Sequence, residues 1–115
     1  MSASSAPEDR YAALVEALRD TPGVTAPADP AAPSRKFGDT GLKTGGKIFA
    51  MLAQGRLVVK LPRHRVDALV AAGSGERFDP GHGRVMKEWL SLDPAAKEEW
   101  LPLAREALEF VAARA

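Results

Sequence analysis

The chain has 115 residues, of which 45% are hydrophobic and 27% are charged, values that are typical of a single ordinary globular domain. It contains no cysteine, which excludes disulfides, thiolate metal sites and a cysteine nucleophile. The first residues lack the apolar region of a secretory signal, and no stretch reaches the roughly 18 apolar residues of a spanning helix. We therefore expect a soluble, cytoplasmic protein that does not act at a membrane.

The net charge is only +1, but the basic residues are concentrated in the middle of the chain. Residues 35–66 contain eight lysines and arginines against one acid, a balance of +7, whereas residues 1–34 and 67–115 each sum to −3. Such an asymmetry can attract an anionic partner, although runs of charge more often form an ordinary solvated surface.

The N-terminal third combines a helical pattern with a segment that cannot be helical. We expect one domain over residues 1–115, with residues 1–7 flexible and residues 22–33 forming a connector rich in proline and alanine. Between Pro7 and Asp20 the apolar residues follow the spacing of an amphipathic helix: Tyr11, Leu14, Val15 and Leu18. A first strand is expected around residues 35–37, followed by a turn at Gly45-Gly46.

Residues 46–61 predict a β-hairpin with a two-residue turn at Gln54-Gly55, since a glycine at the second position allows the positive φ of a tight turn. If Ala53 pairs with Arg56, one face is wholly apolar and is expected to be buried: Ile48, Ala50, Leu52, Leu57, Val59 and Leu61. The opposite face then carries Lys47, Phe49, Met51, Ala53, Arg56, Val58 and Lys60. This second face has an apolar centre with cations at its margin.

The C-terminal half predicts two helices separated by two strands. Pro62 is expected to start a helix that runs to about Ala72. Two short strands over residues 76–79 and 85–92 follow, and alternation in the second places Trp89 on the outer side. Because proline is incompatible with the middle of a helix, Pro102 predicts a short helical segment over residues 94–99, a break, and a final helix over about 101–114.

No set of residues predicts catalysis, a cofactor or a metal. His64 and His82 lie 18 residues apart, and neither has a metal-ligating neighbour at a suitable spacing. No serine lies in a nucleophile elbow. The glycines at 38, 41, 45 and 46 match neither the Walker pattern nor the dinucleotide fingerprint, so turns explain them better. We expect a non-enzymatic protein with no cofactor, no metal and no identifiable small-molecule substrate.

Four segments, residues 46–52, 56–61, 86–90 and 103–108, resemble the MmcQ/YjbR and TfoX N-terminal domain superfamily, and the resemblance covers about residues 8–113. It implies an α+β fold, a two-layer sandwich of an antiparallel sheet with helices on one face in the order α-β(3)-α-β(2)-α, similar in plan to type III secretion chaperones. YjbR-like members are commonly described as DNA-binding, and TfoX relatives as regulators of natural competence. The second, helical domain of full-length TfoX has no counterpart in these residues, and no functional residue is transferred.

Two binding functions and one structural interpretation compete for the second face of the hairpin. The first is protein interaction or homodimerisation through an apolar patch formed by Phe49, Met51, Val58 and Trp89. The alternative is a DNA-binding or transcription-related role, in which phosphates are neutralised by Lys47, Arg56, Lys60, Arg63 and Arg65 and bases or sugars contact Phe49 and Trp89. In the third interpretation Phe49 and Met51 are covered by the connector or the N-terminal helix and belong to the core.

Overall fold

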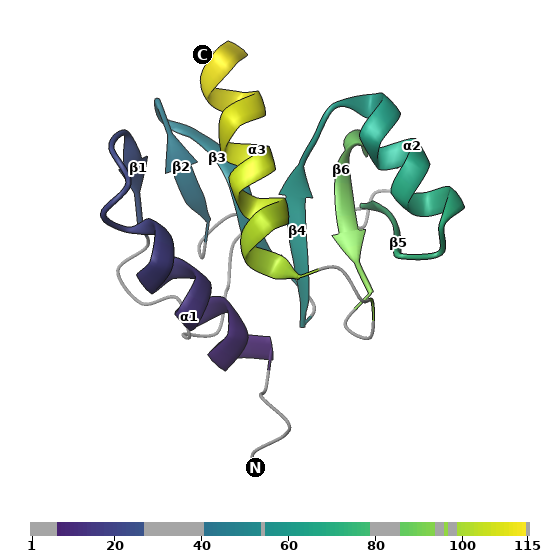
Figure 1. Ribbon diagram of the computed structural model, residues 1–115, viewed down its shortest axis with the longest axis horizontal. Coiled ribbons are helices and arrows are strands. Elements are labelled where there is room, and N and C mark those ends of the chain that lie inside the picture. The colour runs from purple at the N-terminus through teal and green to yellow at the C-terminus, as the bar shows by residue number, and fades with distance from the viewer. Residues whose placement is uncertain are drawn as a thin grey trace.

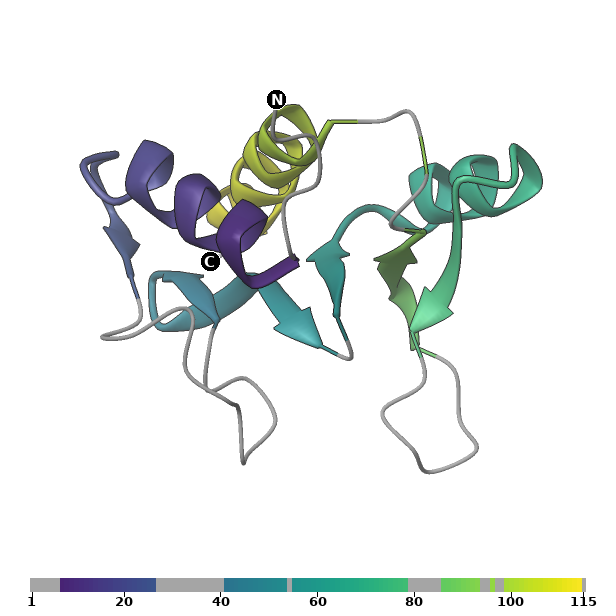
Figure 2. The ribbon, with the colours of Figure 1, turned by 90° about the horizontal axis from the view of Figure 1, so that it is seen from below.

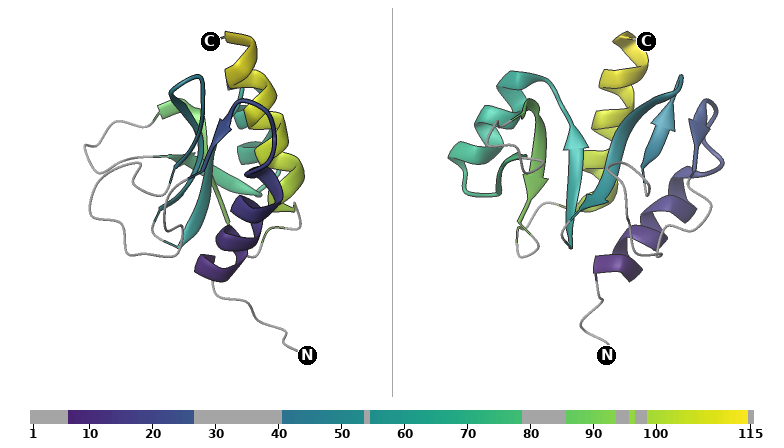
Figure 3. Two further views of the ribbon diagram at one scale, coloured as in Figure 1. Left: turned by 90° about the vertical axis from the view of Figure 1, so that its left-hand side faces the viewer. Right: turned by 180° about the vertical axis from the view of Figure 1, so that it is seen from behind.

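The structure is a computed structural model, and it describes residues 7–26, 41–53, 55–78, 86–93, 96 and 99–114. Within these residues it is an α+β sandwich of two layers, an antiparallel sheet and a layer of helices on one of its faces (Figures 1 and 2). Figure 3 shows the same arrangement from the side, with α1 and α3 together on one side of the sheet. The predicted fold class is confirmed.

The described helices are α1 (Pro7–Leu18), α2 (Arg63–Ala71) and α3 (Trp100–Arg114). The strands are β1 (Val24–Thr25), β2 (Leu42–Thr44), β3 (Lys47–Ala53), β4 (Arg56–Lys60), β5 (Gly75–Phe78) and β6 (Met86–Leu92). Neighbouring strands follow the order β1-β2-β3-β4-β6-β5, and every pairing is antiparallel. Four described strands therefore precede α2, one more than the sequence predicted.

The hairpins form where glycine allows a positive φ. Gly45 and Gly46 join β2 to β3 with φ values of 59° and 79°, the combination that a type I′ turn requires. Gly55, with φ 74°, follows β3 at the predicted turn. The pairing of β3 with β4 has the predicted register, including Ala53 opposite Arg56. These glycines are turn residues, as expected from their spacing.

The main core lies between the sheet and the helices. α1 and α3 pack on β3 and β4, and α2 packs on β5 and β6. The side chain of Arg10 in α1 lies over the ring of Trp100 in α3, with the guanidinium carbon 4.1 Å from the ring centroid. Pro102 falls in the first turn of α3, where its missing N–H costs nothing. The predicted start of the final helix is therefore correct within one residue.

Several predicted features lie outside the described residues, among them the strand at 35–37, the helical segment at 94–99 apart from residues 96 and 99, and most of the connector. Within residues 22–26 the chain forms the short strand β1, which pairs with β2. Strand β2 itself was not predicted, because its three residues are too few to show an alternating pattern.

The alternation of β3 breaks at Phe49, and this corrects the predicted faces. Leu42 of β2 pairs with Ala50, while the next residue, Lys43, pairs with Ile48, so Phe49 is the extra residue of a β-bulge. Phe49 and Ala50 both belong to the main core, and Ile48 packs on the opposite side of the sheet. The prediction that Phe49 faces outward and Ile48 inward is wrong, because period-2 alternation does not continue through a bulge.

Candidate binding surface

A second apolar cluster lies on the face of the sheet opposite the helices, called here the outer face. Met51, Val58, Phe78 and Trp89 form it, with Ile48 and Ala53 packed against its edge. These four side chains are almost fully buried: Met51 is 1% exposed, Val58 0%, Phe78 6% and Trp89 7%. Phe78 was not among the residues predicted for this face, although it is the one apolar residue of the predicted strand at 76–79.

The residues predicted to form an apolar interface are therefore not on an exposed patch. Phe49, with 0% exposure, belongs to the main core, and Met51, Val58 and Trp89 belong to the buried outer cluster. Burial of this kind is what the third interpretation expected of Phe49 and Met51. An interface role for these four residues stays a prediction, and it requires the outer cluster to open and, for Phe49, the main core as well.

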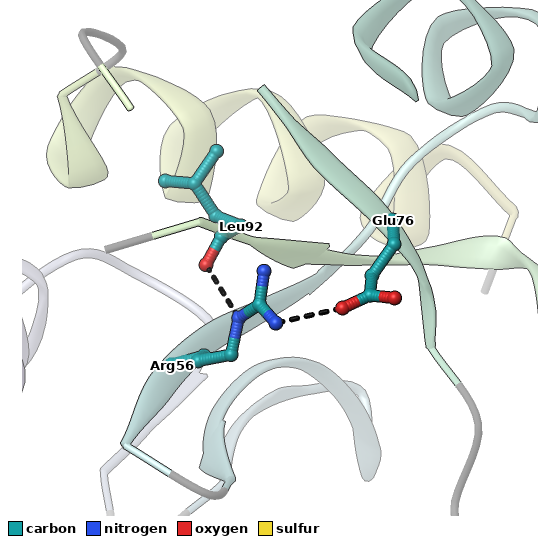
Figure 4. A network of polar contacts seen from close by, with 3 residues as sticks. All are labelled: Arg56, Glu76 and Leu92. Carbon is teal, nitrogen blue, oxygen red and sulfur yellow. Dashed lines mark hydrogen bonds and ion pairs between the residues drawn. The ribbon is translucent and has the colours of Figure 1, made fainter. Parts of the chain in front are cut away.

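Arg56 is held by two neighbouring strands (Figure 4). Its Nε donates to the backbone oxygen of Leu92 on β6 at 3.2 Å, and its Nη1 donates to Glu76 on β5 at 2.7 Å. The Arg56 side chain is 24% exposed. The guanidinium therefore forms hydrogen bonds to both of these neighbouring strands, and Arg56 links β4 to β6 and β5.

Two more of the predicted phosphate-binding residues also contact carboxylates. Arg65 on α2 donates from Nε to Glu106 on α3 at 2.9 Å, which joins the two helices. Lys60 at the end of β4 is 3.9 Å from Glu88, a looser pair, and its Nζ lies 5.6 Å from the centroid of the Trp89 ring. Arg65 is thus part of the helix layer, whereas Lys60 keeps hydrogen-bond donors for another partner.

The remaining cations are exposed at one end of the sheet. Lys47 begins β3 and Arg63 begins α2 just beyond the end of β4, and both side chains are exposed. Lys43 on β2 pairs with Ile48, which contacts the outer cluster, and Lys87 lies two residues before Trp89 on β6. Antiparallel pairing brings the end of β2, the start of β3, the end of β4 and the start of β6 together. We call this set the basic end: Lys43, Lys47, Lys60, Arg63 and Lys87.

Four members of the basic end, all except Lys60, form no ion pair within the described ranges. Lys43 and Lys87 were missed by the sequence reasoning, which weighed the hairpin 46–61 and did not place the neighbouring strands beside it. No local pattern in the sequence identifies them, because Lys43 is followed by Thr44 and Lys87 by Glu88. The pairing of β2 and β6 with the hairpin gives them a common location.

A hollow opens at the basic end, beside the start of β3, the end of β4 and the last turn of α3. Its volume is about 140 Å³, and its described lining consists of Lys47, Ile48, Lys60 and Val111. Two lysines and two aliphatic residues thus surround a small hollow at the basic end. Among the described residues no cluster of three or more histidine, cysteine or acidic side chains is arranged to hold a metal ion.

The family model of the TfoX N-terminal domain matches residues 24–111, which is most of the chain. The chain belongs to the TfoX N-terminal domain family. No curated protein and no solved structure matches it significantly.

The match of the TfoX N-terminal domain begins at residue 24, so it includes the sheet, α2 and most of α3 but not α1. In this protein α1 nevertheless supplies Tyr11, Leu14, Val15 and Leu18 to the main core. Membership of this family indicates a small binding or regulatory module. None of the helices in the described part of the chain is long and apolar enough to cross a membrane.

Proposed function

We propose that this domain is a non-enzymatic module that binds nucleic acid through its basic end. The observation that carries the proposal is the set of exposed cations Lys43, Lys47, Arg63 and Lys87, which have no carboxylate partner within the described residues. Most other basic side chains of known placement are paired, as Arg56, Arg65 and Arg77 are. Free cations gathered at one end, on a chain of net charge +1, give a local rather than a global positive field.

The spacing of the strands suits a polyanion. From β2 to β6 there are three strand intervals, which span about 14 Å at the usual separation. Duplex DNA carries about one charge per 1.7 Å of its axis, so a length of this size presents about eight phosphates. The five cations of the basic end therefore can contact several phosphates at once without a deep groove.

Protein interaction through the outer apolar cluster is the weaker candidate, because its side chains have little free surface. Met51 and Val58 are at most 1% exposed, and an interface core needs apolar area that is exposed before binding. Light scattering distinguishes the two: a monomer at high protein concentration contradicts homodimerisation through this cluster and leaves the nucleic-acid proposal unaffected.

The proposal is tested by fluorescence anisotropy of a labelled duplex and of a labelled single strand, each at about 50 and about 200 mM salt. Four phosphate contacts predict a slope of log affinity against log salt of about −3.6, hence a loss on the order of 100-fold between these concentrations. Replacing Lys47 and Arg63 by Gln should weaken binding and reduce the steepness by about 0.9 for each charge removed. Arg105→Gln is the matched control, because Arg105 is exposed on α3, away from the outer face.

Absence of duplex and single-strand binding at the lower salt concentration would overturn the proposal. Equal losses in Lys47→Gln and Arg105→Gln would also overturn it, since only the net charge of the protein would then matter. A steep salt dependence that disappears stepwise with substitutions at the basic end would support it.

A further inference from the structure

We infer that the hollow lined by Lys47, Ile48, Lys60 and Val111 is a binding site for a single phosphate group. The inference rests on the proposed function, because the hollow is one part of the basic end. If the domain binds nucleic acid, a phosphate of the nucleic-acid backbone is the expected occupant of the hollow. The chemistry is that of a phosphate held between two ammonium groups. A free phosphate ion carries the same chemistry, and the experiment below separates the two sources.

The two lysines are suited to share one anion. The Lys60 ammonium lies 3.9 Å from Glu88 and 5.6 Å from the centroid of the Trp89 ring. An ammonium has three donors, so a single carboxylate at that distance leaves donors directed elsewhere. Lys47 is exposed and makes no ion pair with any described residue, so its charge is available in full.

The size of the hollow decides the class of ligand. A volume of about 140 Å³ corresponds to a few water molecules at about 30 Å³ each, enough for a phosphate group. Pockets for drug-sized ligands and cofactors are about 300–1,000 Å³, so a whole nucleotide does not fit inside. The aliphatic walls, Ile48 and Val111, offer no hydrogen bonds to a base edge.

The end of α3 weakens the attraction of the hollow for an anion, so the charge of each lysine matters. Val111 lies in the last turn of α3, where the helix dipole places a partial negative charge that repels anions. This partial charge of about half an elementary charge offsets part of the attraction that the two lysines exert on a phosphate. Removal of either lysine should consequently cost most of the binding.

The experiment uses Ile48, the sole isoleucine in the sequence, as a reporter within the hollow. The full chain is labelled at the isoleucine δ1 methyl, and the methyl NMR signal is followed during titration with inorganic phosphate. Sodium chloride at matched ionic strength is the parallel titration. We expect a saturable shift with phosphate and none with chloride.

Variants then identify the groups responsible. A hydrogen bond to a charged group contributes about 1.5–3 kcal/mol, so Lys47→Gln and Lys60→Gln should each weaken phosphate binding by about tenfold or more. Arg105→Gln should bind phosphate as the parent does. Unchanged Ile48 spectra of the free variants show that the hollow itself is preserved. Equal shifts with chloride, or no effect of either lysine, would overturn the inference.

A titration with duplex DNA separates this inference from the proposed function. A shift of Ile48 with both phosphate and duplex, with phosphate competing, supports both. Duplex binding without a shift of Ile48 overturns the phosphate site and leaves the proposed function standing. A phosphate shift with no duplex binding supports the site, assigns it to a free phosphate, and overturns the proposed function.

Discussion

Lys60 and Trp89 lie opposite each other on β4 and β6, and the Lys60 ammonium is 5.6 Å from the centroid of the indole ring. The buried Trp89 belongs to the outer cluster, while the Lys60 side chain is 32% exposed and lines the hollow. The contact between these two residues therefore connects the outer cluster to the basic end.

The contribution of this pair to stability should be small. Lys60→Gln removes a cation–π contact and a loose ion pair with Glu88, so we expect the free energy of unfolding to fall by about 0.5–1 kcal/mol. Urea unfolding monitored by Trp89 fluorescence in a Trp100→Phe background measures this, since the chain has two tryptophans. A loss well above that range would assign Lys60 a structural role and disqualify it as a binding variant.

Phe49→Ala should be strongly destabilising. Phe49 is fully buried in the main core, and truncation of a buried phenylalanine costs about 3–5 kcal/mol in unfolding free energy. Ile48→Val, at the half-buried neighbouring position, should cost about 1 kcal/mol or less. Chemical denaturation of the two variants compares them. Near-parent stability of Phe49→Ala would place this side chain outside the core and contradict the bulge.

The hairpin shows what local sequence information can determine. The register of β3 with β4 follows from the apolar pattern and from the glycine at the turn, and it was predicted correctly. The bulge at Phe49 depends on how β2 pairs with β3, and β2 has only three residues, too few for a pattern. The face on which a side chain of β3 lies depends here on its pairing with a third strand, β2. It therefore cannot be inferred from the alternation of apolar and polar residues in β3 and β4 alone.

The candidate site has the same limitation. Exposed Lys47 and Arg63 were selected from the sequence, but Arg56 and Arg65 were selected with them and are engaged by Glu76 and Glu106. These carboxylates lie 20 and 41 residues further along the chain, so no local pattern identifies them. The charge of a segment can be counted from the sequence. Whether residues far along the chain neutralise that charge is known only from the folded structure.

Leu18→Ala tests the contribution of α1, which precedes the part of the chain that matches the family. Leu18 is fully buried, so its truncation should lower the free energy of unfolding by about 2–5 kcal/mol. Glu16→Gln is the control on the same helix. Its side chain is 68% exposed and forms a surface pair with Arg19, which contributes about 0.5 kcal/mol or less. Equal stability of the two variants would show that α1 does not pack on the sheet in solution.

Tyr11, the single tyrosine, should give the protein a defined loss of stability at alkaline pH. Burial raises the pKa of its phenol above the ordinary value of 10.0, and a hydrogen bond with the Leu42 backbone offsets part of that shift. The folded state thus keeps its proton after the unfolded state has lost it. The resulting stabilisation is complete below pH 10.0 and is lost as the pH rises above it, by about 1.4 kcal/mol per pH unit.

Tyr11→Phe isolates this effect from the titration of the lysines, which both proteins share. Near neutral pH the variant should lose about 1–2 kcal/mol, because it loses the long hydrogen bond, 3.4 Å, that the phenol donates to the Ala50 oxygen and also the hydrogen bond with the Leu42 backbone. Urea unfolding of both proteins at a series of pH values measures the difference. As the pH rises above 10.0, the parent should lose its advantage and become the less stable protein. A difference that stays constant with pH would mean that Tyr11 ionises equally in both states and is therefore open to water in the folded protein.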